Sequence, residues 1–131
     1  MTVTWRLVKH DGKAVAASLK VADGFWSLLI GWQFCKAPPA GEALLLVPCK
    51  SVHTFFVRFP MDVIILDRRG RVVKVRRHVR PWRIVAPVVD GYATLELPGG
   101  TAEVEEGDLL RLEGAAGAAV PRSLAFLCAR C

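Results

Sequence analysis

The sequence has no hydrophobic run long enough to cross a membrane and no leader-like start. Its longest apolar window covers only residues 24–35, between Asp23 and Lys36, whereas a membrane-spanning helix needs about 20 residues. Residues 1–13 lack the basic, apolar and small-residue order of a signal peptide. We therefore expect a cytoplasmic protein with no membrane span, whose 4 cysteines are reduced thiols rather than disulfides.

The sequence also lacks the motifs of common enzyme classes. It has no phosphate-binding loop, dinucleotide fingerprint, metalloprotease helix or paired-carboxylate motif. Acidic residues are few beside basic ones, with 12 Asp and Glu against 18 Lys and Arg, so that the net charge is +6. This charge permits an anionic partner without requiring one. The 53% hydrophobic content excludes disorder, and 131 residues fit one domain.

Alternation of polar and apolar residues is abundant, and turn dipeptides interrupt it at short intervals, as is typical of short antiparallel strands. A short helix is predicted from Asp23 to Trp32, where apolar residues recur at helical spacing. We predict a mainly β protein, a compact antiparallel β-sandwich or partly closed β-barrel of about seven or eight short strands with one short helix. The predicted strands are Val3–Val8, Ala14–Val21, Leu44–Val47, Val52–Phe59, Val63–Leu66, Arg71–Arg80, Thr94–Leu97 and Leu109–Leu112.

The chain changes character near its end. Residues 114–119 are all Gly or Ala, which is typical of a linker. We predict a single mainly β domain over residues 1–113 and, over residues 114–131, a small-residue linker with a cysteine-containing tail. In this tail, Leu124–Leu127 either docks as a last strand or remains mobile.

Basic residues are concentrated in one segment. Residues 68–83 contain Lys and Arg but no acid, whereas most of the acids lie in residues 90–113. Alternation along a strand places Lys74, Arg76, His78 and Arg80 on one face, next to Trp82. This stripe is a candidate anion-binding site, because cations can follow a phosphate backbone while the indole stacks on a base.

A plainer interpretation of the basic segment is that it is neutralised within the sheet. Opposite charges on neighbouring strands stabilise a sheet, and the acidic segment can supply the partners. We favour this interpretation over nucleic-acid binding. Arg77 lies on the face of the valines and requires an edge position or a buried acid such as Asp62. The proposed partners of the other bases are Glu96, Glu103, Glu105 and Glu106.

Cysteine and histidine offer a metal or nucleophile hypothesis. The terminal pair Cys128 and Cys131 has the spacing of a zinc ligand pair, which Cys49 and His53 could complete. Cys49 and His53 also suggest a nucleophile and base, but no glycine-rich elbow or oxyanion donor accompanies them. We therefore expect ordinary thiols and no cofactor, with zinc as the alternative.

Three ordered motifs resemble the family called Domain of Unknown Function 192. They are residues 48–54 (Pro-Cys-Lys-Ser-Val-His-Thr), 58–64 (Arg-Phe-Pro-Met-Asp-Val-Ile) and 95–100 (Leu-Glu-Leu-Pro-Gly-Gly), supported by 66–67, 72–73 and 107–108. The resemblance covers about residues 20–113 and implies a compact, mostly β domain without an established activity. The matching motif positions are His53, Thr54, Asp62, Glu96, Gly99, Gly107 and Asp108.

The chain departs from the family pattern at two places. Phe56 and Val57 stand where the family usually has Gly and Met, and residues 25–31 lack the Arg that the family usually shows before Gly-Leu. A family ligand that touches either place would be bound differently here.

Polar motif residues next to apolar runs predict a small polar pocket, because buried polar groups must be paired or face a cavity. We expect a non-enzymatic binding or accessory module. The alternatives are nucleic-acid or other polyanion binding through residues 71–83, and a small hydrolase or metal-dependent enzyme centred on His53 and Asp62. A protein partner or a small anionic ligand is compatible with each binding hypothesis. The candidate pocket residues are His53, Thr54, Asp62, Arg83 and Glu96.

Overall fold

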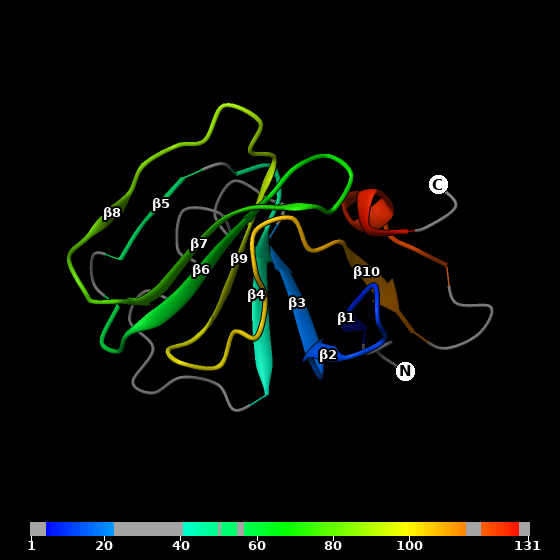
Figure 1. The fold of residues 1–131 in the computed structure, drawn as a ribbon, viewed down its shortest axis with the longest axis horizontal. Coiled ribbons are helices and arrows are strands. Elements are labelled where there is room, and N and C mark those ends of the chain that lie inside the picture. The colour runs from blue at the N-terminus through cyan, green and yellow to red at the C-terminus, as the bar shows by residue number, and fades with distance from the viewer. Residues whose placement is uncertain (1–4, 23–40, 50, 55–56, 115–118, 129–131) are drawn as a thin grey trace.

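The computed structural model describes residues 5–22, 41–49, 51–54, 57–114 and 119–128. In this part of the chain the protein is mainly β (Figure 1). The elements are β1 (Arg6–Lys9), β2 (Ala14–Ala16), β3 (Ser18–Ala22), β4 (Glu42–Leu46), β5 (Val52–His53), β6 (Met61–Leu66), β7 (Val72–Val79), β8 (Ile84–Val85), β9 (Ala93–Pro98), β10 (Leu110–Glu113) and the 3₁₀-helix η1 (Arg122–Leu127).

The strands form three sheets. The largest has the order β3-β4-β9-β6-β7, a smaller one has the order β10-β1-β2, and β5 pairs with β8. In Figure 1 the smaller sheet and η1 lie on one side of the large sheet, whereas β5 and β8 lie on the other. This layered packing confirms the sandwich prediction, and the described sheets do not close into a barrel.

The large sheet is covered on both faces. Ile64 and Leu95 belong to a core cluster with Leu7 and Leu110 of the smaller sheet and with η1. Met61, Val63 and Ile65 point the other way and pack with residues that include Val57, Phe59 and Val85. All of β6 is therefore buried, as its apolar sequence predicts.

The expectation of purely antiparallel strands is wrong at one pair, because β3 runs parallel to β4. The predicted strand Ala14–Val21 is divided at Ala17 between two sheets, since β2 pairs with β1 and β3 with β4. A strand that passes from one layer to the other in this way forms a corner of a sandwich.

Two further predictions need correction, a third lies outside the described residues, and a fourth is not tested. Among the described residues of the strand predicted over Val52–Phe59, only Val52–His53 form a strand, because Thr54 turns its hydrogen bonds toward residues 80–83. Leu124–Leu127 belongs to η1 rather than to a strand, with Leu124 and Leu127 buried in the core. The predicted helix from Asp23 to Trp32 lies outside the described residues, and the division at residue 114 remains a prediction.

Candidate functional site

Thr54 holds the connection between β7 and β8. Its buried hydroxyl donates a hydrogen bond to the carbonyl of Arg80 (2.6 Å) and accepts one from the main-chain N–H of Arg83 (2.8 Å). Its own N–H bonds to the Arg83 carbonyl (2.8 Å), and the N–H of Trp82 bonds to the Thr54 carbonyl (3.1 Å). These bonds maintain Trp82 at φ +65°, a left-handed conformation that non-glycine residues rarely adopt.

Asp62, like Thr54, joins separate backbone segments through its side chain; such a residue is called a backbone clamp below. Its buried carboxylate accepts the main-chain N–H groups of His78 (2.9 Å), Gly100 (3.0 Å) and Ala102 (2.8 Å). His78 is the other described non-glycine residue at positive φ, +53°. Asp62 thus joins the end of β7 to the turn after β9, and its hydrogen-bonding capacity serves the fold.

Glu96 faces the core cluster that contains Met61, Val63 and Ile65, where its neighbours are apolar. Its register partners are Leu44 on β4 and Val63 on β6. The residue is 4% exposed, and no described hydrogen-bonding group reaches its Oε2 atom. Burial raises the pKa of Glu96 to about 8, so the carboxyl is mostly protonated at neutral pH.

The structure therefore brings together only part of the predicted pocket. Thr54 and Arg83 are hydrogen-bonded, but no described hydrogen bond joins this pair to Asp62 or Glu96. His53 is exposed on β5 opposite Ile84. The motif residues are distributed over two clamps and one buried carboxyl, rather than around a single described cavity.

The basic stripe is less regular than alternation predicts. Lys74 and Arg76 share a face, opposite Ile65 and Val63 of β6, but register shifts interrupt the pairing at both ends of β7. His78 leaves this face, because its N–H is held by Asp62 and its ring lies against Gly100. Two shifts of register in an eight-residue strand change which side chains share a face.

The predicted pairing of the basic segment with the acidic segment is found, among the described residues, only at Arg77, the one base for which these acids were not predicted as partners. This guanidinium reaches Glu105 (3.4 Å) and the Val104 carbonyl (2.5 Å), so it needs no contact with Asp62. Glu96 is buried without a described cation at ion-pair distance, and no described carboxylate lies within 4.0 Å of the other basic side chains in residues 71–83. Arg76, Arg80 and Arg83 are exposed, next to Trp82 (57% exposed) and Ile84 (72% exposed).

The cysteines do not form a metal centre in the described part of the chain. No group of three or more His, Cys, Asp or Glu is placed there to hold a metal ion. Cys49 donates its thiol to the Ser51 carbonyl (2.9 Å), and Cys128 is half-buried directly after η1. Cys131 lies outside the described residues, so the zinc hypothesis and the expectation of no cofactor remain predictions.

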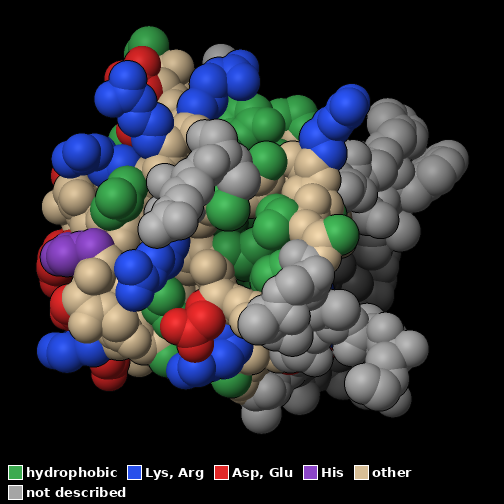
Figure 2. Space-filling view, turned by 90° about the vertical axis from the view of Figure 1, so that its right-hand side faces the viewer, with side chains coloured by type: hydrophobic (Ala, Val, Ile, Leu, Met, Phe, Trp, Pro, Cys, Tyr) green, Lys and Arg blue, Asp and Glu red, His purple; other side chains and the backbone are tan. Residues whose placement is uncertain are grey.

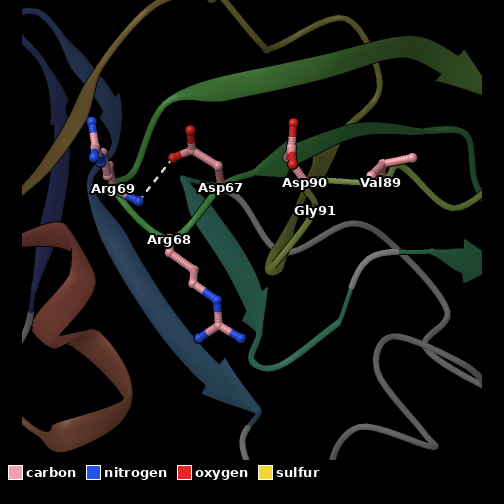
Figure 3. Close-up of a pocket in the computed structure, with 6 residues that line it drawn as sticks. All are labelled: Asp67, Arg68, Arg69, Val89, Asp90 and Gly91. Carbon is pink, nitrogen blue, oxygen red and sulfur yellow. Dashed lines mark hydrogen bonds between the residues drawn. The ribbon is translucent and has the colours of Figure 1, made fainter.

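Sequence reasoning missed a groove where two turns meet. The groove has a volume of about 420 Å³. In Figure 3 the carboxylates of Asp67 and Asp90 point to one side, while the guanidinium of Arg68 points to the other, where it lies over the Tyr92 ring at 4.6 Å. A ligand with charges of both signs suits this lining. The residues around the groove are Asp67, Arg68, Arg69, Val89, Asp90 and Gly91.

In the sequence, the groove residues belong to two separate turn motifs, and neither motif alone predicts a groove. Asp67-Arg68-Arg69-Gly70 indicates a hairpin turn, and Asp67 fulfils that role by accepting the N–H groups of Arg69 (2.8 Å) and Arg71 (3.0 Å). Asp90-Gly91 is a second turn signal. Nothing in the sequence shows that the two turns are neighbours.

No helix in the described part of the chain is long and apolar enough to cross a membrane.

Comparison with known proteins agrees with the geometry of the sheets. A solved protein of unknown function from Novosphingobium aromaticivorans matches 83% of this chain and 84% of its own with a TM-score of 0.71 and 18% identity. A solved structure described as a putative transcription regulator from Sinorhizobium meliloti matches 86% of this chain and 92% of its own, with a TM-score of 0.68 and 21% identity. At these identities the matches show a shared fold.

Sequence relatives identify the family. A UPF0127 protein of Thermococcus kodakarensis is 36% identical over 108 residues, which are 76% of this chain and 67% of that protein. A UPF0127 protein of Pyrococcus furiosus is 32% identical over 107 residues, 76% of this chain and 90% of its own. The DUF192 family model, described as "Uncharacterized ACR, COG1430", matches residues 6–112. The chain therefore belongs to the DUF192 family, whose members matched here have no specific function assigned.

Proposed function

We propose that the protein is a non-enzymatic binding module that binds single-stranded nucleic acid. The binding site is the Trp82 surface, defined here as Lys74, Arg76, Arg80, Trp82, Arg83 and Ile84. The observation that carries the proposal is the exposed indole of Trp82, held at positive φ by Thr54 beside exposed arginines. Non-glycine residues in such conformations are costly and cluster at functional sites.

The charge around Trp82 is available for phosphates. Arg76, Arg80 and Arg83 have no described carboxylate within ion-pair distance. Lys74 reaches the carbonyl of Ala86 (3.2 Å), which brings the end of the connection after β8 next to β7. Lys74 and Arg76 on β7, with Arg80 and Arg83 in the connection to β8, are the cations that would contact a flexible polyanion.

The combination of groups favours an unpaired strand. An aromatic ring stacks on an exposed base, and nearby arginines neutralise the backbone, which gives tight but sequence-tolerant binding. The described Trp82 surface adds one aliphatic side chain, Ile84, to the indole. We favour a nucleic acid over an anionic membrane surface because the four cations of this surface outnumber its two apolar side chains.

The test is a titration of fluorescently labelled 20-nucleotide oligothymidylate, followed by anisotropy at increasing sodium chloride concentrations. Three or four phosphate contacts predict that log K falls against log salt with a slope of about −2 to −3. Trp82→Asn should weaken binding about tenfold or more through lost stacking while leaving this slope unchanged, since Asn tolerates positive φ. Replacing both Arg80 and Arg83 by Gln should reduce the slope by about 1.4.

Arg122→Gln is the matched control, because this exposed arginine on η1 loses the same charge outside the Trp82 surface. An equal effect of Arg122→Gln and Arg80→Gln would show attraction by net charge alone. Binding that is insensitive to salt would overturn the proposal, as would binding to phosphatidylglycerol vesicles with no binding to the oligonucleotide. A cytoplasmic location is part of the same proposal, since it would give access to nucleic acid.

A further inference from the structure

A second and smaller pocket lies on the opposite side of the molecule from β5 and β8, between β10 and η1. It has a volume of about 150 Å³. Its buried floor contains Leu110 and Leu127, with the partly buried ring of Phe126. Its exposed rim contains His10, Arg69 and Arg111. The pocket therefore combines an apolar interior with a basic mouth.

The walls of this pocket are fixed by close backbone contacts. Gly70, at φ +82°, approaches so closely that a Cβ atom there would lie 2.8 Å from the Leu110 carbonyl and 3.2 Å from Leu127. Leu110 donates its N–H to the Gly70 carbonyl (2.9 Å). Phe126 packs edge-on against Tyr92, with ring centroids 5.1 Å apart. These contacts tie η1 to the β6–β7 turn and hold the pocket open in a defined shape.

The basic mouth is not neutralised by the described acids. None of the ion pairs in the described chain involves Arg69 or Arg111. Asp67, two residues before Arg69, accepts the main-chain N–H groups of Arg69 (2.8 Å) and Arg71 (3.0 Å). Asp11 accepts the main-chain N–H of Lys13 (2.9 Å), and Asp108 faces Lys9 (3.9 Å). On this side of the molecule, hydrophobic side chains gather near the middle of the described surface and several Lys and Arg side chains lie beside them (Figure 2).

Size and charge together define the ligand. A space of about 150 Å³ lined by aliphatic and aromatic groups is large enough for one benzene ring. A carboxylate on such a ring can reach the guanidinium groups at the mouth, where charge-assisted hydrogen bonds are strongest. We propose that the pocket between β10 and η1 binds a small aromatic carboxylate, with its ring against Leu110, Leu127 and Phe126 and its carboxylate between Arg69 and Arg111.

The experiment uses the full chain labelled with ¹⁵N and titrated with sodium benzoate, followed by amide shifts in proton–nitrogen spectra. Benzoate should shift the amides of residues 69–71, 109–111 and 126–128 with saturation. Benzyl alcohol, which has the ring without the charge, and acetate, which has the charge without the ring, should bind at least tenfold more weakly. Replacing Arg69 and Arg111 together by Gln should weaken benzoate binding about tenfold, the loss of about one charged hydrogen bond.

Arg122→Gln again serves as the charge control, because it lies on η1 but does not line the pocket. Equal binding of benzoate and benzyl alcohol would overturn the proposal by showing an apolar cavity without anion selectivity. Shifts confined to the Trp82 surface, or benzoate binding unchanged by the arginine variant, would also overturn it. Oligothymidylate binding should be retained in the variant with both substitutions, so this proposal and the nucleic-acid proposal fail independently.

Discussion

Thr54 and Arg83 are joined by two hydrogen bonds of 2.8 Å, from the N–H of Thr54 to the carbonyl of Arg83 and from the N–H of Arg83 to the hydroxyl of Thr54. This reciprocal pair closes the loop that presents Trp82. A residue that matches a family motif thus acts on the proposed binding surface from beneath it. Its contribution to binding is positioning, because the Thr54 side chain is buried.

The first prediction concerns Thr54→Val, which keeps the shape of the side chain and removes its hydrogen bonds. Leaving the Arg83 N–H without its partner should lower the free energy of unfolding by about 1 to 3 kcal/mol. Urea denaturation measures this loss. Thr54→Ser keeps the hydroxyl and should recover most of the stability. If Thr54→Val weakens oligothymidylate binding and Thr54→Ser does not, the geometry of the loop matters for binding. Equal affinity of the two variants would show that the hydrogen bonds of the Thr54 hydroxyl do not affect binding.

The second prediction concerns Asp62→Ala. Three main-chain N–H groups lose their acceptor, so we expect a loss of about 3 kcal/mol or more in the free energy of unfolding. Asp62→Asn should lose less, because its amide oxygen can still accept the N–H groups of His78 and Gly100. Chemical denaturation of both variants checks the order. A smaller loss for Ala than for Asn would contradict the clamp.

The buried strand β6 shows how much of the fold could be predicted from sequence. Val63 to Leu66 are apolar on both faces, and this pattern is sufficient to predict a strand covered on two sides. The hairpin into β7 follows from Asp67 and Gly70, because turn chemistry is local. Elements whose partners are also local in sequence were therefore predicted well.

The sequence-based predictions fail where residues that are distant in the sequence act on a strand. The regular stripe along β7 fails because Asp62 captures the N–H of His78 from a neighbouring strand. The groove of Asp67 and Asp90 depends on the meeting of two turns, and the pocket of Arg69 and Arg111 on the packing of η1. Periodicity reports one strand at a time, so it cannot reveal a register shift or a cavity formed by separate segments.

The third prediction uses two glycines that share a left-handed conformation but differ in surroundings. A Cβ atom added to Gly12, at φ +88°, would have open space for 4 Å around it, whereas one added to Gly70, at φ +82°, would press against Leu110 and Leu127. Gly12→Ala should cost only the conformational penalty, about 1 to 2 kcal/mol. Gly70→Ala adds a clash with the Leu110 carbonyl and should cost about 1 to 3 kcal/mol more, as overpacking does.

Thermal denaturation of the two alanine variants measures the difference directly, because the conformational penalty is common to both. The excess loss at Gly70 should be accompanied by amide shifts in β10 and η1, and benzoate binding should weaken. Equal destabilisation by the two substitutions would show that β10 and η1 can move away from Gly70 at no cost.

The fourth prediction follows from the buried carboxyl of Glu96. Burial raises its pKa from 4.5 to about 8, so between these values the folded state holds a proton that the unfolded state has released. Stability should therefore be greatest below pH 4.5 as far as this group is concerned, and should fall as the pH rises toward 8. The slope approaches about 1.4 kcal/mol per pH unit for a fully titrating group.

Glu96→Gln tests this directly, because the amide cannot ionise. The cost of burying the amide of the Glu96→Gln variant is the same at every pH. The test is therefore how the difference in free energy of unfolding between the wild-type protein and Glu96→Gln changes with pH. Urea denaturation from pH 5 to pH 8.5 should show the wild-type protein losing stability relative to Glu96→Gln as the pH rises. Parallel curves over this range would mean that Glu96 finds a partner for its charge in the folded protein. A wild-type protein that instead loses stability relative to Glu96→Gln as the pH falls would show that the pKa is lowered rather than raised.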